Sequence, residues 1–267
     1  MTDPSYDFRY EIDGDGVAVL TLDRPATLNS LTFAIYAQLE KLFADLDSDA
    51  RVKALVLTGA GRGFCSGGNV EEIIEPLLGR ELAETLKFTR MTGAVVRNMR
   101  RTSKPILAAV NGVAAGAGTV LALAADLRVL SEKASFAFLF ARVGLTGADM
   151  GAAYLLPRVV GMGRASELLL LGDKIDAQEC SRIGLANRVV APEKLMEETL
   201  DLARRLAKGP TLAHATTKRL LLNESHMDLE SAIEQEAQAQ ALLLRAHDHA
   251  EFHRAWQEKR EPRFEGR

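Results

Sequence analysis

Two glycine-rich loops constrain the fold of this chain more than any other feature of its sequence. The first, Gly59–Gly68, follows the apolar run Lys53–Thr58, and the second, Asn111–Gly118, follows Pro105–Val110. Small residues at such positions let a ligand atom approach backbone N–H groups near helix N-termini, where partial positive charge favours an oxyanion. The same glycines also suit tight turns and close helix–strand packing, so one loop alone does not decide a function.

Neither loop has the spacing of a nucleotide-binding motif. No Gly-Lys-Ser/Thr follows the first loop, and neither loop reads G-x-G-x-x-G, so ATP and NAD are poorly supported as ligands. The formal net charge of −3 over 267 residues leaves no broad basic field for nucleic acid or an anionic membrane.

The pattern of apolar residues alternates between strand and helix over the first part of the chain, which indicates an α/β layer structure. An Asp-Gly turn predicts a hairpin at the N-terminal end. After about residue 150 the pattern is almost wholly helical. The expected strands are Phe8–Ile12, Val17–Leu22, Lys53–Thr58, Pro105–Val110, Leu127–Leu130 and one late strand, Arg188–Val190; the expected helices are Leu31–Leu46, Val70–Arg101, Val120–Ala125, Ala232–Leu244 and His249–Lys259.

The N-terminal segment and the cysteines predict a cytoplasmic protein without a metal site. Met1–Tyr10 is polar and acidic, and no stretch approaches the ~20 apolar residues of a membrane span. Cys65 and Cys180 match no metal or redox spacing. A Cys65 nucleophile is one alternative, although no histidine stands near it in sequence.

Several motifs, in order along nearly the whole chain, resemble those of the crotonase (enoyl-CoA hydratase/isomerase) family. Phe64–Val70 (FCSGGNV) is similar to the first family signature, and Asn111–Gly118 (NGVAAGAG) is similar to the second. The segments Leu22–Leu31, Leu156–Gly172, Ala177–Val190 and Lys259–Phe264 also match.

This resemblance implies a spiral of ββα turns in residues 1–192 and a helical trimerisation region in residues 193–267. It implies an acyl-CoA thioester substrate, no separate cofactor, and a homotrimer or dimer of trimers. The N–H groups of Gly68 and Ala117 would be the oxyanion donors. The residues expected to contact the substrate are Leu28, Ser66, Asn69, Val70, Val120, Phe140, Phe252 and Lys259.

The chain departs from the family pattern at the catalytic acids. Family hydratases use two glutamates, and their positions here correspond to the apolar Val120 and Phe140. The interpretation of the chain as an ordinary enoyl-CoA hydratase is therefore weakened, because no pair of acids is present to orient water. Asp149 remains, at an offset where some family isomerases and a dehalogenase place an aspartate, whereas the second acid of dienoyl isomerases is replaced by Ala141.

A single carboxylate suits a proton shuttle, and an apolar wall should raise its pKa from the ordinary ~3.9. The candidate wall residues are Phe136, Phe138, Phe140 and Met150. Alternatively, Asp149 caps a helix starting near Met150, or attacks as a nucleophile. The preferred interpretation is an acyl-CoA isomerase; the alternatives are a hydratase in which Asp149 handles water and a non-catalytic acyl-CoA binder.

Overall fold

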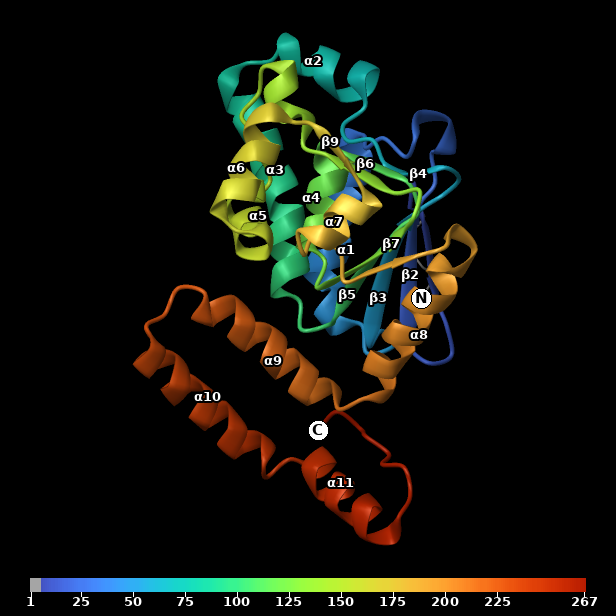
Figure 1. Cartoon of the computed structure of the whole chain (residues 1–267), viewed down its shortest axis with the longest axis vertical. Coiled ribbons are helices and arrows are strands. Elements are labelled where there is room, and N and C mark those ends of the chain that lie inside the picture. Colours follow the sequence, from blue (N-terminus) through green and yellow to red (C-terminus); the bar gives the residue numbers. More distant parts are fainter. Residues whose placement is uncertain (1–5) are drawn as a thin grey trace.

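The computed structural model describes residues 6–267, in which helices surround two β-sheets (Figure 1). Within this range the larger sheet has the order β1-β2-β3-β5-β7-β10 and the smaller has the order β4-β6-β8-β9. Neighbouring strands are parallel except in the β1–β2 and β8–β9 pairs. The strands are β1 (Arg9–Ile12), β2 (Val17–Leu22), β3 (Ala54–Gly59), β4 (Gly63–Cys65), β5 (Ile106–Val110), β6 (Val113–Ala115), β7 (Leu127–Ser131), β8 (Ser135–Ala137), β9 (Lys174–Asp176) and β10 (Arg188–Val190).

The helices follow the strands in a repeating order. The α-helices are α1 (Phe33–Asp45), α2 (Glu75–Leu78), α3 (Leu82–Arg101), α4 (Ala117–Ala124), α5 (Ala152–Val160), α6 (Met162–Leu171), α7 (Ala177–Arg182), α8 (Leu195–Lys208), α9 (Thr211–Glu224), α10 (Leu229–Leu243) and α11 (His247–Glu258). Three times, a strand of the large sheet leads to a short strand of the small sheet and then to helix: β3-β4-α2-α3, β5-β6-α4 and β7-β8-α5-α6. The expected α/β spiral of ββα turns is confirmed.

The central strands are apolar on both faces because both faces are covered, as is usual for parallel sheets. In β3, Leu55 and Leu57 join the main core, which α1, α3 and α4 also build. Ala54 and Val56 point the other way, into a second cluster that includes Leu195 of α8. Helix α8 therefore belongs to the layer that covers the large sheet.

Four short strands were not expected from the sequence. The glycine-rich loops contain β4 and β6, and β8 and β9 complete the small sheet. Strand β9 also corrects the expectation that Arg188–Val190 is the one late strand. Each of these strands has three residues, too few to show a period, and the pairing with neighbouring strands keeps them extended.

The expected helices differ from the observed ones mainly at their ends. Helix α1 begins two residues later than expected, because the Thr32 side chain caps it by accepting the N–H of Ile35 at 3.2 Å. The expected helix Val70–Arg101 is broken into a π-helical turn, Val70–Ile74, followed by α2 and α3. Helix α4 starts at Ala117 rather than Val120, within the second glycine loop.

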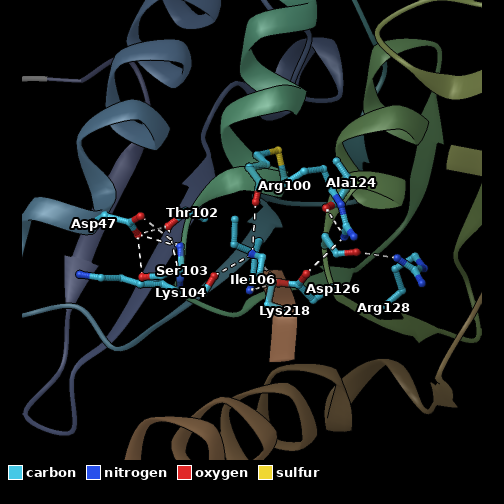
Figure 2. Close-up of polar contacts among 12 residues, drawn as sticks. Asp47, Arg100, Thr102, Ser103, Lys104, Ile106, Ala124, Asp126, Arg128 and Lys218 are labelled. Atoms are coloured by element: carbon cyan, nitrogen blue, oxygen red, sulfur yellow. Dashed lines mark hydrogen bonds and ion pairs between the residues drawn. The ribbon is translucent and has the colours of Figure 1, made fainter. Parts of the chain in front are cut away.

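Helices α9, α10 and α11 form an arm that extends away from the two sheets (Figure 1). Lys218 of α9 is buried where the arm meets the body, and its Nζ donates to the carbonyls of Lys104 and Met99 (2.8 and 3.2 Å). It also pairs with Asp126 at 2.7 Å, and Asp126 in turn accepts from Arg100 at 3.2 Å (Figure 2). Burial lowers the pKa of Lys218, and the Asp126 carboxylate opposes that effect.

Several large apolar side chains of the arm are exposed: Leu229, Ile233, Leu242, Leu244, Phe252 and Trp256. The division of the chain at residues 192 and 193 stays a prediction. Within residues 6–267, no helix combines the length and the apolar character needed to cross a bilayer.

Candidate active site

The two glycine-rich loops meet in the structure. A Cβ atom added to Gly67 would lie 3.4 Å from the N of Ala117, and one added to Gly116 would lie 3.9 Å from the Cα of Gly67. Both glycines have positive φ, +96° and +51°, which residues with a side chain rarely adopt. The sequence needs glycine here because the backbone turns sharply where the loops approach each other.

Each of these glycines is followed by a residue whose N–H group is free. Leu31 donates its N–H to Gly67 O at 2.8 Å, and Asn69 donates its N–H to Leu31 O at 2.9 Å. The N–H of Gly68, which lies between these two hydrogen bonds, takes no part in this pairing. Ala117 is the first residue of α4. Within residues 6–267, neither the Gly68 N–H nor the Ala117 N–H donates to another protein group. Two free donors near a helix N-terminus suit the binding of an oxyanion, and the role of Gly68 and Ala117 as oxyanion donors stays a prediction.

Two asparagines fix the shape of the first loop. The Nδ2 groups of Asn29 and Asn111 both donate to Gly63 O, at 2.7 and 3.0 Å. The second loop then packs directly on the first: a Cβ on Gly118 would lie only 2.1 Å from Cys65 O. These contacts hold the two donor residues at a fixed separation.

Asp149 stands on a strained turn immediately before α5. Its Oδ1 accepts the N–H of Met150 at 2.9 Å. Met150 and Gly151 have φ of +50° and +91°, and a positive φ is uncommon for a residue such as methionine. Helix α5 starts at Ala152 and its N-cap is Gly151, which makes no side-chain cap. The alternative that Asp149 caps a helix beginning near Met150 is therefore wrong.

Burial raises the pKa of the Asp149 carboxyl, and the hydrogen bond from Met150 N–H partly opposes that shift. This direction agrees with the apolar wall expected from the sequence. The four residues proposed for the wall all belong to the buried main core: Phe136, Phe138, Phe140 and Met150. A carboxylate with a raised pKa is a better proton acceptor than a solvated aspartate.

The expected substrate-contacting residues of the core differ in what their side chains do. The side chains of Val120 and Phe140 are buried, and that of Val70 is largely exposed. The backbone of Leu28 has a left-handed conformation, with φ of +53°. Ser66 donates its hydroxyl to Thr27 O at 2.8 Å. Asn69 caps the π-helical turn by accepting the N–H of Glu72 at 2.9 Å. Roles for these residues toward a substrate stay predictions.

Phe252 lies on α11 and Lys259 directly follows that helix, at the opposite end of the molecule from β4 and β6 (Figure 1). Phe252 is 52% exposed, and Lys259 ends the helix with φ of +54°. Within one chain, the structure does not bring these two residues to the glycine loops.

Tyr36 was missed by sequence reasoning because it looks like an ordinary core position of a helix. Its side chain is buried on α1, and burial raises its pKa well above the ordinary value, with smaller contributions from the nearby Cys65 and Asp149. Burial also raises the pKa of the Cys65 thiol to about 12, with the Gly67 N–H partly opposing it. A thiol that stays protonated is a poor nucleophile, which disfavours the Cys65 alternative.

Two free backbone donors at the meeting point of two ββα turns, together with the half-buried carboxyl of Asp149, are typical of enzymes that stabilise an oxyanion while moving a proton. The family model of enoyl-CoA hydratase/isomerase matches residues 13–267, and the chain belongs to this crotonase family of enzymes.

Relatives cover almost the whole chain. It is 36% identical to 1,2-epoxyphenylacetyl-CoA isomerase of Escherichia coli K12, over 94% of this chain and 96% of the relative. It is 32% identical to a short-chain-enoyl-CoA hydratase of Clostridium acetobutylicum, over 91% and 92% of the two chains.

Solved structures agree with this assignment. A Streptomyces coelicolor A3(2) protein with a provisional enoyl-CoA hydratase name superposes with a TM-score of 0.97 at 55% identity, covering 100% of this chain and 97% of that one. An enoyl-CoA hydratase from Bacillus anthracis gives a TM-score of 0.91 at 29% identity, covering 98% and 100%.

Proposed function

We propose that the protein is a cofactor-free acyl-CoA isomerase in which Asp149 moves a proton between carbon atoms of the acyl chain. One observation carries this proposal. Of the four positions at which family resemblance locates a catalytic acid, Asp149 alone has a carboxyl group; the others are Val120, Phe140 and Ala141. A site with one acid suits proton transfer better than the activation of water by a pair of acids.

In this mechanism the thioester oxygen accepts hydrogen bonds from the N–H groups of Gly68 and Ala117. The Asp149 carboxylate removes an α or γ proton, and the electron pair of the broken C–H bond moves into an enolate whose negative oxygen faces the two donors. Asp149 then returns the proton to a different carbon, and the double bond moves along the chain. Each backbone donor of this kind contributes about 3–4 kcal/mol to transition-state stabilisation.

Hydration of 2-enoyl-CoA is the second candidate. The Clostridium acetobutylicum relative is named as a hydratase, whereas the Escherichia coli relative is named as an isomerase. In a hydratase, Asp149 alone would take a proton from water, the water oxygen would add to the β carbon, and Asp149 would give the proton to the α carbon as the enolate collapses.

The proposal also includes a homotrimer, or a dimer of trimers, assembled through the arm. The exposed apolar side chains of α10 and α11 support it, because surfaces of this kind are commonly buried between subunits. In such an assembly, Phe252 and Lys259 would reach the CoA of a neighbouring subunit. Sedimentation analysis tests this: a monomer at micromolar concentration contradicts it.

The activity is tested with 2-enoyl, 3-enoyl and aryl-CoA thioesters in heavy water, followed by mass spectrometry. We expect deuterium in the acyl chain without added oxygen, and loss of this exchange in Asp149→Asn. Asp173→Asn, at an exposed aspartate, is the matched control and should exchange normally. A mass gain of one water would establish hydration instead, and an unchanged mass across the panel would favour the acyl-CoA binder.

A further inference from the structure

The start of α1 is tied directly to the oxyanion loop. Leu31 bridges Gly68 through two backbone hydrogen bonds, and Thr32, the next residue, caps the helix. Tyr36 donates its N–H to Thr32 O at 3.0 Å, so it lies in the first turn of α1, about 6 Å along the axis from the cap. The fold therefore fixes Tyr36 close to one side of the proposed site.

The opposite side of the site is joined to Tyr36 through α3. The Tyr36 ring meets the Phe88 ring edge-on, with centroids 5.6 Å apart. Val96, two turns further along α3, lies 3.8 Å from the Cβ position of Gly151, beside the Asp149 turn. Helix α3 thus contacts both Tyr36 and the turn that holds Asp149, and the electrostatic coupling of the Tyr36 hydroxyl to Cys65 and Asp149 agrees with a position near both.

The Tyr36 hydroxyl is a polar group without a protein partner. Its residue is only 3% exposed, yet within residues 6–267 no protein group hydrogen-bonds to this hydroxyl. Its oxygen is also not among the unpartnered side-chain atoms of the described residues that are sealed from solvent, so a small molecule can reach it. This hydroxyl is therefore free to donate to a ligand that supplies an acceptor, and a hydrogen bond of this kind typically contributes about 0.5–1.5 kcal/mol.

We propose that Tyr36 is a specificity-determining residue whose hydroxyl donates a hydrogen bond to an oxygen atom on the acyl group. The preferred substrates are then acyl-CoA thioesters with a hydroxyl, ether or carbonyl oxygen near the reacting carbons, rather than plain hydrocarbon chains. This inference rests on the proposed function, because it takes the acyl group to lie between the Gly68 and Ala117 donors and Asp149. A site built to bond a substrate oxygen discriminates strongly against analogues that lack it.

The test measures binding by calorimetry in the Asp149→Asn background, so that turnover does not interfere. Pairs of acyl-CoA thioesters that differ only by one oxygen substituent are the ligands. We expect the oxygenated member to bind at least about tenfold tighter, and Tyr36→Phe to remove that advantage by weakening this member alone. Phenylalanine keeps the ring contact with Phe88, and Tyr154→Phe, at a hydroxyl that pairs with Ser225 near the arm, is the control.

Equal binding of both members before the substitution, or an equal loss for both after it, would overturn the inference. Failure of the proposed function is recognised separately, by the absence of isotope exchange in the unsubstituted protein. If Tyr36→Phe weakens binding of the oxygenated ligand alone, the inference about Tyr36 holds even then, because the calorimetry measures binding and not turnover.

Discussion

Replacing Asp149 by asparagine should remove the chemistry and make the fold more stable at pH 8. The carboxyl group is partly buried, it accepts a hydrogen bond from Met150 N–H at 2.9 Å, and burial raises its pKa. Ionised Asp149 therefore opposes folding. Asparagine is neutral, has nearly the same shape, and keeps an oxygen that accepts the Met150 N–H.

The sign and size of the effect follow from linkage. The pKa is higher in the folded state than in the unfolded chain, so the folded state binds the proton more tightly. The destabilisation from Asp149 is full above the folded pKa and disappears as the pH falls below the unfolded value of about 3.9. Each pKa unit between the folded and unfolded states corresponds to about 1.4 kcal/mol in the free energy of unfolding. Each kcal/mol of that free energy moves Tm by about 2–4 °C in domains of roughly this size.

Thermal unfolding from pH 4 to pH 8 measures this without any substrate. We expect Tm of Asp149→Asn to exceed that of the parent by a few degrees at pH 8, with the gain shrinking toward pH 4. Asp126→Asn is the matched control and should lower Tm, because it leaves the buried Lys218 without its counter-charge. A lower Tm for Asp149→Asn at pH 8, or a gain that does not vary with pH, would refute the reasoning.

Three further results are expected. Gly118→Ala puts a Cβ within 2.1 Å of a backbone oxygen. It should displace one oxyanion donor and lower kcat by about 10²–10³-fold. Gly163→Ala is the control, because its Cβ meets open space, and it should leave kcat unchanged in the same kinetic assay. Lys218→Met should free the arm while the sheets stay folded, seen as hydrogen exchange that rises in α9 but not in β3 or β5. Burial raises the thiol pKa of Cys65 and of Cys180 to about 12, so neither should react with iodoacetamide at pH 8 until the protein is unfolded, as mass spectrometry would show.

The layer structure could be predicted from the sequence because long buried strands have a strong local pattern. Lys53–Thr58 and Pro105–Val110 are apolar on both faces, and they form β3 and β5 at the centre of the large sheet. The three-residue strands of the small sheet have no such pattern. Their extension depends on pairing with segments that lie far away in sequence, such as Gly63 with Val113.

The candidate site shows the same division. Glycine composition and motif order indicated the loop pair, but the positive φ values of Gly67 and Gly116 appear only when the loops are packed together. Tyr36 could not be distinguished from core residues, because a helical pattern predicts that a side chain is buried and not which polar atom is left without a protein partner. The role of Asp149 as a helix cap was a reasonable local interpretation, and the left-handed turn at Met150 excludes it.

The proposed binding of the thioester oxygen by the main-chain N–H groups of Gly68 and Ala117 has an evolutionary consequence. A point mutation changes a side chain, and except for proline it leaves the backbone N–H in place. After gene duplication, descendant proteins can therefore keep the two proposed hydrogen bonds to the thioester oxygen, while selection changes the side chains at Val120, Phe140 and Asp149. New reactions arise in such a lineage by exchanging the groups that handle protons, with the anchoring step already present in every copy.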